Sequence, residues 1–231
     1  MRISAIVPVL NEEATLPAFL AMCARWDAID EVLFSDGGSD DATLELLEGR
    51  AVIVGAQGRG AQCRLAAEQA YGDALVFVHA DTLVAPDAMR AIRNALEDGA
   101  TWGCLTLRFS GGSSAMAFGA FASNARVRLT GIPFGDQVMF MTRDAYERVG
   151  GMPDLPLMED YELARRLRAL AWPRQLRSQA LTSARRFEEG GTLRTMAQMR
   201  RLRHLYRKGA DIDELARLYR TQRELDRKSV V

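Results

Sequence analysis

The chain has 231 residues, of which 48% are hydrophobic, and its 30 basic side chains balance 30 acidic ones. This composition is typical of a globular protein and excludes a largely disordered chain. A formal net charge of zero excludes binding to nucleic acid by bulk charge, so we expect no nucleic-acid partner. The length suits one α/β domain with a short appendage.

Cysteine use and hydropathy predict a cytoplasmic location. Cys23, Cys63 and Cys104 are odd in number and have no C-x-x-C spacing, so neither a disulfide framework nor a zinc site is expected. The first residues show no signal-peptide pattern. Because no window of about 18 residues is apolar and uncharged, we expect no transmembrane helix.

Apolar runs and helical periodicities alternate along the first hundred residues. The run at 3–10 is continuous enough for a strand buried on both faces. Thr15 is the expected N-cap of the first helix, with Pro17 in its first turn. The predicted elements are a strand at 3–10, a helix at 15–26, a strand at 31–35, a helix at 41–48, a strand at 51–54, a helix at 58–71, a strand at 74–78 and a helix at 86–97.

The second half predicts further strands at 101–109 and 137–142, and helices at 144–149 and 158–170. We expect residues 109–123 to form a variable loop that contacts an acceptor. The last 40 or so residues are predicted to be helical and strongly charged. Strand–helix alternation of this kind predicts an α/β fold, with a mostly parallel central sheet, helices on both faces and a C-terminal helical segment.

Three predicted strands each release a polar group at their carboxyl end. The first is followed by Asn11 and Glu12, the second by Asp36, and the fourth by His79 and Asp81. Ligands bind at this edge of open α/β sheets, and gathered carboxylates favour a hard cation such as Mg²⁺ or Mn²⁺. Taken singly, each residue is also explained as a helix cap, a turn former or a buried histidine.

The order of the motifs resembles a known family. Their spacing is similar to that of family 2 glycosyltransferases with the GT-A fold, and most similar to the bacterial subgroup named for arsenosugar biosynthesis. The resemblance covers residues 2–187 and implies a GT-A domain at 1–187, followed by a basic amphipathic helical extension at 188–231. The motifs are PVLNEE (8–13), SDGGSDD (35–41), GRGAQCRLAA (58–67), VFVHADT (76–82), GDQVMF (135–140) and GGMPDLPLMEDYELARRL (150–167).

The resemblance implies a site for a nucleotide-sugar donor. The D-x-D motif of the family, which holds the metal that bridges the diphosphate, becomes His79-Ala80-Asp81 here. Asp81 keeps the position linked to Mn²⁺ or Mg²⁺, whereas histidine replaces the first aspartate, as is typical of the subgroup. The residues implied to hold the base and ribose are Pro8, Leu10, Asn11, Glu12 and Asp36.

The remaining site residues follow from the later motifs. The resemblance implies that Asp160 is the general base, with Glu159 beside it, and both also suit the first turn of any helix. Asp136, Gln137 and Glu159 are candidates for contact with sugar or acceptor, and Asp136 and Gln137 are otherwise members of a simple turn. The arginines have either a donor contact or a solvated position: Arg59 could reach the donor, and Arg185 and Arg186 could neutralise its diphosphate.

These features predict a metal-dependent, inverting glycosyltransferase of hexosyltransferase type, acting on a small-molecule or lipid acceptor. The alternative is a non-catalytic nucleotide-binding or scaffold protein derived from such an enzyme, which His79 favours and the retention of Asp81 and Asp160 disfavours. Nucleotidyl transfer would need a basic glycine-rich loop after the first strand, where residues 8–13 are acidic.

The tail is basic. Residues 185–231 hold 13 Lys and Arg against 7 Asp and Glu, whereas the rest of the chain holds 17 against 23. This segment is expected to dock on its own domain or on a second subunit of a homodimer, or to lie on an anionic membrane at the inner face. In the membrane alternative, removing 188–231 should release the protein from anionic liposomes. The apolar stripe is Met196, Met199, Leu202, Leu205 and Tyr206, flanked by Arg200, Arg201, Arg203 and Arg207.

Overall fold

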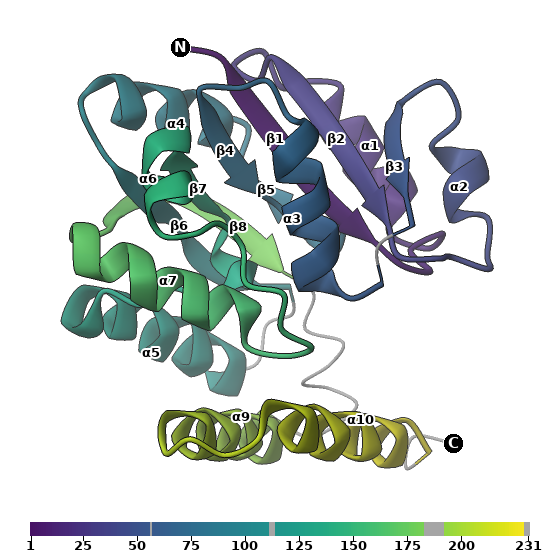
Figure 1. Ribbon diagram of the computed structural model, residues 1–231, viewed down its shortest axis with the longest axis vertical. Coiled ribbons are helices and arrows are strands. Elements are labelled where there is room, and N and C mark those ends of the chain that lie inside the picture. Colours follow the sequence, from purple (N-terminus) through teal and green to yellow (C-terminus); the bar gives the residue numbers. More distant parts are fainter. Residues whose placement is uncertain (56, 111–113, 183–191, 229–231) are drawn as a thin grey trace.

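The computed structural model describes residues 1–55, 57–110, 114–182 and 192–228. A central sheet carries helices on both faces, and two C-terminal helices lie along one side of the domain (Figure 1). The sheet has eight strands in the order β3-β2-β1-β4-β7-β6-β8-β5. The strands are β1 (Ile3–Val9), β2 (Glu31–Asp36), β3 (Ala51–Val54), β4 (Ala74–Phe77), β5 (Thr82–Val84), β6 (Trp102–Phe109), β7 (Met139–Thr142) and β8 (Arg174–Thr182).

The helices surround this sheet. The helices of the described residues are α1 (Leu16–Cys23), α2 (Thr43–Leu46), α3 (Arg59–Gln69), α4 (Ala88–Glu97), α5 (Ser114–Thr130), the 3-10 helix η1 (Gly135–Gln137), α6 (Arg143–Arg148), α7 (Glu159–Leu170), α9 (Thr192–Arg207) and α10 (Ile212–Lys228).

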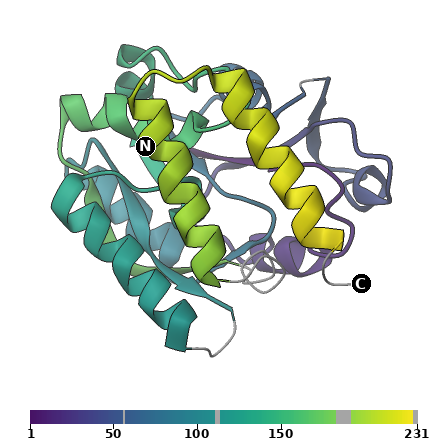
Figure 2. The same ribbon diagram turned by 90° about the horizontal axis from the view of Figure 1, so that it is seen from below.

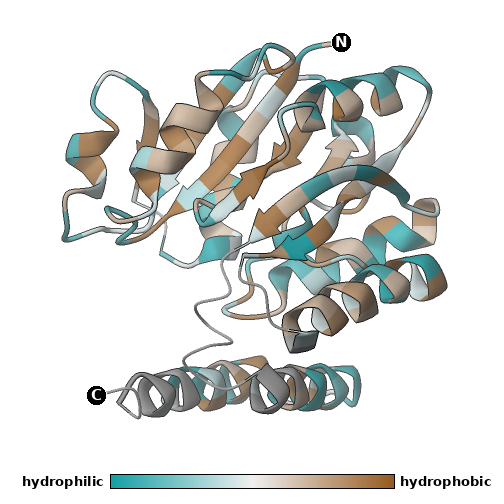
Figure 3. Ribbon diagram, turned by 180° about the vertical axis from the view of Figure 1, so that it is seen from behind, coloured by the Kyte–Doolittle hydropathy of each residue, from teal (hydrophilic) through white to brown (hydrophobic). Residues whose placement is uncertain are grey.

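The continuous apolar runs form strands because both faces of the sheet are covered. Successive side chains of a strand point to opposite faces. Ile3 and Val7 of β1 therefore pack into the core shared with α1 and α4, while Ile6 packs into the core shared with α3, α6 and α7. Figure 3 shows the hydrophobic residues concentrated in these central strands. The predicted α/β architecture is confirmed.

The sheet is mixed, and its antiparallel strand shapes the site. Strands β3, β2, β1 and β4 run parallel, but β7 pairs antiparallel with β4 and places Met139 opposite Phe77. The chain just before β7 therefore meets the carboxyl end of β4. This brings η1, with its GDQ motif, beside the residues that follow β4.

Three local predictions differ from the structure. The helix expected at 41–48 is the single turn α2. The short strand β5, which was not predicted, follows the HAD motif and pairs with β8 at the sheet edge. Part of the loop expected at 109–123 belongs to α5, and Asn124 of this helix anchors it by bonding both the backbone N–H and C=O of Leu107 in β6, at 2.9 and 3.0 Å.

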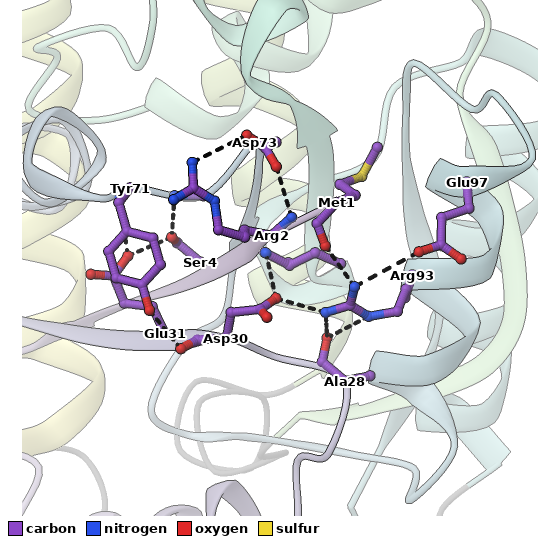
Figure 4. A network of polar contacts seen from close by, with 12 residues as sticks. Met1, Arg2, Ser4, Ala28, Asp30, Glu31, Tyr71, Asp73, Arg93 and Glu97 are labelled. Carbon is purple, nitrogen blue, oxygen red and sulfur yellow. Dashed lines mark hydrogen bonds and ion pairs between the residues drawn. The ribbon is translucent and has the colours of Figure 1, made fainter.

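The amino edge of the sheet is closed by a paired polar network (Figure 4). Asp30 accepts a hydrogen bond from the backbone N–H of Ile3 at 2.8 Å and forms an ion pair with Arg93 at 2.6 Å. Arg93 also donates to the carbonyls of Ala28 and Met1. These contacts tie the first residues of β1 to the loop that precedes β2 and to α4.

The C-terminal helices dock on their own domain. Helices α9 and α10 lie side by side across the domain (Figure 2). Leu202 of α9 and Leu215 of α10 are buried with Leu157 and Met158, which precede α7. The docking prediction is thus confirmed for the described part of the apolar stripe, while the side chain of Met196 and the boundary at 187–188 lie outside the described residues. Among the described residues, no helix is both long and apolar enough to cross a membrane.

Candidate active site

A cavity of about 560 Å³ lies where the carboxyl end of β4 meets α5, α7, α9 and α10. Five of the predicted polar residues line it, namely Arg59, His79, Asp81, Asp136 and Asp160. They come from separate parts of the chain, which the fold brings together because β7 returns beside β4 and α7 begins next to η1.

Asp36 organises the loop that follows β2. Its carboxylate is completely buried and accepts hydrogen bonds from the N–H groups of Gly38 and Ser39, at 2.8 and 3.0 Å, and from the Ser39 hydroxyl at 2.5 Å. Asn11 joins this loop to the end of β1, since its N–H donates to Ser39 Oγ and its Oδ1 accepts from the Asp40 N–H. The turn-forming role of Asp36 is therefore present in the structure.

The other residues predicted to hold base and ribose lie along the same edge but outside the cavity lining. Pro8 is buried within β1, and Leu10 is 51% exposed. The backbone N–H of Glu12 donates to Thr43 Oγ1 at 2.8 Å, and its carboxylate accepts from the hydroxyl of Thr15. The side-chain cap expected from Thr15 is therefore absent, because its hydroxyl serves Glu12.

Helix α3 connects this edge to the cavity. The side-chain amide of Gln62 donates to the carbonyls of Val9 and Ser35, at 2.8 and 2.6 Å, and so bridges the ends of β1 and β2. Arg59, one turn earlier, lines the cavity and forms an ion pair with Glu159 of α7. Burial disfavours the charge on Arg59, but Glu159 and Asp160 raise its pKa, so the side chain stays cationic.

Asp160 is held in place by backbone amides. Its Oδ2 accepts from the Gly135 N–H at 2.8 Å, and its Oδ1 accepts from the Tyr161 N–H at 2.7 Å. A Cβ on Gly135 would lie 2.7 Å from the imidazole of His79 and 3.2 Å from Asp160 Oδ2. Only glycine therefore allows the backbone of η1 to approach both side chains.

The neighbouring acids and the histidine have shifted pKa values. Burial lowers the pKa of His79 to about 4, and Arg59 adds to this fall while Asp81 and Asp160 oppose it. Burial raises the pKa of Asp136 to about 6; Arg126 opposes this rise, and Asp160 and Asp81 add to it. Asp136 Oδ1 is buried without a hydrogen-bond partner. At neutral pH, His79 is uncharged and carries a free nitrogen lone pair.

Sequence reasoning missed three arginines of the cavity, namely Arg126, Arg200 and Arg203. Arg126 of α5 and Arg203 of α9 both stack on Phe134, with guanidinium carbons 3.7 and 4.7 Å from the ring centre. Their role in the cavity becomes clear only from contacts in the folded chain. Arg126, for example, donates hydrogen bonds to Ile132 O and Gln137 Oε1. A guanidinium over an aromatic face is a favourable cation–π arrangement.

Some residues that were predicted to contact the substrate instead hold other side chains, and others lie outside the described residues. Gln137 and Glu159 are almost completely buried, at 0% and 3% exposure, and hold Arg126 and Arg59 respectively. Their burial does not support direct contact with a sugar. Ala80 is also buried. Arg185 and Arg186 lie outside the described residues.

The described residues do not include three or more His, Cys, Asp or Glu side chains grouped to hold a metal ion. Asp81 nevertheless suits a cation that takes most of its ligands from elsewhere. Its carboxylate is half-buried and lines the cavity, and within the described residues it has one weak contact, with the hydroxyl of Thr82 at 3.3 Å from Oδ1. Mg²⁺ commonly binds through one or two carboxylates plus substrate phosphates and water.

Backbone strain gathers at the same edge. Among the described non-glycine residues, only Asn11, Val138 and Met158 have positive φ, at 54°, 51° and 67°. Asn11 follows β1, Val138 follows η1, and Met158 precedes α7 and lines the cavity. A β-branched residue in this region is a genuine outlier, and such strain clusters at functional sites.

Residues 4–150 match the glycosyl transferase family 2 profile, and the chain belongs to this family. It is 31% identical over 111 residues to an undecaprenyl-phosphate 4-deoxy-4-formamido-L-arabinose transferase of Aeromonas hydrophila, a match that covers 42% of this chain and about a third (34%) of that protein.

Solved structures share the GT-A fold. Residues 1–349 of TarS from S. aureus superpose with a TM-score of 0.62 at 18% identity, covering 82% of this chain and 62% of that one. The mannosyltransferase PcManGT of Pyrobaculum calidifontis, solved with GDP-Man and Mn²⁺, has a TM-score of 0.60 at 20% identity, covering 87% and 64%. The chain thus has the GT-A fold of these structures.

Proposed function

We propose that this protein transfers a sugar, with inversion and with the help of a divalent metal, from a nucleotide-diphosphate donor to a small-molecule or lipid acceptor. The observation that carries the proposal is that Asp81, after β4, and Asp160, in the first turn of α7, line one cavity. Hexosyl transfer is part of this proposal, as is the similarity to the arsenosugar subgroup.

Similar proteins support the donor and the metal. TarS was also solved with UDP and with UDP-GlcNAc, and PcManGT with GDP-Man and Mn²⁺. The A. hydrophila relative is named for undecaprenyl phosphate, which supports a lipid acceptor for this chain. Such an acceptor would bring the protein to the cytoplasmic face of a membrane.

Asp81 would hold Mn²⁺ or Mg²⁺ together with the donor diphosphate, with the neutral imidazole of His79 beside it. When bound, the ion offsets the negative charge that develops on the departing diphosphate. The loops after β1 and β2, with Glu12 and Asp36, would hold the nucleoside, and Arg59 would face the donor from α3.

Asp160 would act as the base. An acceptor oxygen attacks the anomeric carbon as the bond from that carbon to the diphosphate oxygen breaks. Where this oxygen belongs to a hydroxyl group, its proton passes to Asp160. The two backbone N–H groups that bond Asp160 fix its orientation. It lies at the amino end of α7, which is the positive end of the helix dipole.

The test is a screen of UDP-, GDP- and dTDP-sugars with Mn²⁺ or with EDTA, measuring nucleoside diphosphate release and the anomeric configuration of the product by NMR. We expect metal-dependent release and an inverted product. Release that survives EDTA, a retained configuration, or no release with any donor would contradict the proposal.

A further inference from the structure

Two half-buried cations of the cavity have no carboxylate partner among the residues that the structure describes. Arg126 and Arg203 both lie over Phe134, and neither forms an ion pair with an acid in the part of the chain that the structure describes. Their bonded acceptors are neutral: the carbonyl of Ile132 and the side-chain amide of Gln137 for Arg126, and the carbonyl of Met199 for Arg203. These contacts orient the guanidinium groups without neutralising them.

Burial disfavours the charge on these two arginines more than the neighbouring acids favour it. Burial lowers the pKa of Arg126 to about 10, and Arg203 adds to this fall while Asp136 opposes it. Burial also lowers the pKa of Arg203, with Arg200 adding to the effect. Both groups remain charged at neutral pH, so two desolvated cations repel each other inside one cavity. A bound dianion would remove this cost.

The pair shares its cavity with the proposed base, Asp160. Asp136 and Asp160 are the acids that act on both arginines. Because the proposed base must touch the acceptor, an acceptor bound in this cavity would also lie within reach of the pair.

Apolar residues of α5, α9 and α10 lie next to the two arginines. Phe118, Ala122 and Arg126 follow each other at four-residue steps along one face of α5. Ala122 lines the cavity, and Phe118 is 63% exposed. Met199 of α9 and Tyr219 of α10 line the cavity from the C-terminal helices. The cationic pair is therefore flanked by apolar surface that extends outward.

We propose that Arg126 and Arg203 bind a phosphate group of the acceptor, and that the apolar lining receives the rest of that molecule. This inference rests on the proposed function and names its acceptor class. A phosphate monoester carries close to two negative charges at neutral pH, which matches two guanidinium groups. Helix α9 then belongs to the acceptor site, because it supplies one of the two cations.

The test is calorimetric binding of two phosphate esters to the full chain without donor. Geranyl phosphate represents a lipid phosphate, and glycerol 3-phosphate represents a small one; geraniol and glycerol are the uncharged controls. We expect a phosphate ester to bind and its alcohol not to bind. Tighter binding of geranyl phosphate would identify a lipid acceptor, and tighter binding of glycerol 3-phosphate a small one. Failure of both esters to bind would overturn the inference.

Two arginines of one helix provide the matched variants. Arg203→Ala removes a cation that lines the cavity, and Arg201→Ala removes an exposed one two positions away. We expect Arg203→Ala to weaken ester binding about tenfold or more, since hydrogen bonds to charged groups contribute about 1.5–3 kcal/mol, and Arg201→Ala to leave it unchanged. Arg126→Gln should weaken it similarly. Equal effects of Arg203→Ala and Arg201→Ala would refute the assignment.

Measurements of nucleotide binding distinguish this inference from the proposed function. UDP, GDP and dTDP with Mn²⁺ should bind the Arg203→Ala variant as they bind the wild type. Loss of nucleotide binding in the variant would place the pair on the donor and overturn the inference. Absence of nucleotide binding in the wild type would instead count against the proposed function, whereas the ester result would still decide the phosphate site.

Discussion

The two edges of the central sheet differ in how their charged groups are paired. At the amino edge, Asp30, Arg93 and their neighbours are joined by ion pairs and hydrogen bonds (Figure 4). At the carboxyl edge, Asp136 has an orphaned oxygen, and Arg126 and Arg203 have no carboxylate partner among the described residues. The same sheet therefore supports a closed network at one end and uncompensated groups at the other.

Strain follows the same division. The described non-glycine residues with positive φ lie at the carboxyl edge or beside the cavity. A protein keeps unpaired charge and strained backbone where a ligand is to complete the contacts, and real proteins depart from local rules mainly at such sites. Substitutions at the amino edge should thus alter stability, and substitutions at the carboxyl edge should alter turnover.

The largest effect is expected for Asp160→Asn. The amide cannot accept the proton of the acceptor, so turnover should fall about 10²–10⁴-fold while donor affinity stays nearly unchanged. Initial rates and calorimetric nucleotide binding measure the two quantities. Asp73→Asn, at the amino edge, is the control and should keep full turnover. Unchanged turnover in Asp160→Asn would remove this residue from the role of base.

Gly135→Ala should have the next largest effect. The added Cβ would lie 2.7 Å from the ring of His79, so η1 or the imidazole must shift. Because small displacements of catalytic groups are costly, we expect turnover to fall by up to about 10²-fold. Steady-state kinetics beside thermal melting test this. A variant as active as the wild type would show that the close packing of Gly135 and His79 is dispensable.

At the amino edge, Arg93→Ala should lower the free energy of unfolding by about 2 kcal/mol, because three hydrogen bonds to carbonyls and a partly exposed ion pair are lost. Turnover should be unchanged. Arg90→Ala is the matched control on the same helix; its exposed pair with Asp27 should contribute less than about 1 kcal/mol. Urea denaturation measures both. Equal destabilisation by both changes would contradict the importance of this network.

The smallest effect concerns pH. Because the pKa of Asp136 rises from 3.8 to about 6 on folding, the native state binds more protons than the unfolded state between these values. Stability should therefore fall as pH rises from about 4 to 6, and change little from this group above that range. Asp136→Asn should lack this fall and be about 1–2 kcal/mol more stable at pH 7. Parallel pH profiles of the two proteins would contradict the shift.

Sequence patterns predicted the strands and the acids at their carboxyl ends, because these features depend on neighbouring residues in the chain. The apolar runs of β1 and β4 reflect burial on both faces, and the acids that follow β1, β2 and β4 necessarily share one edge because these strands are parallel. Of the four acids expected around one site, Asp81 and Asp160 line the cavity, whereas Glu12 and Asp36 lie outside its lining.

The missed features depend on contacts between distant residues. Helix α5 contains many small residues and Gly119, which blur its periodicity, and it is anchored by Asn124 on β6. Nothing in the local sequence distinguishes Arg126 or Arg203 from the other basic residues. Both are identified as a pair only because they stack on Phe134, which lies in a third segment of the chain.

The central claim is that the carboxyl edge binds a nucleotide diphosphate through a metal held by Asp81. Titration of UDP, GDP and dTDP with and without Mn²⁺ tests it, with Asp81→Asn beside Asp87→Asn, whose carboxylate bonds Ser178 outside the cavity. We predict metal-dependent binding that Asp81→Asn weakens at least tenfold and Asp87→Asn preserves. Binding that needs no metal, or that is the same in both variants, would contradict the claim.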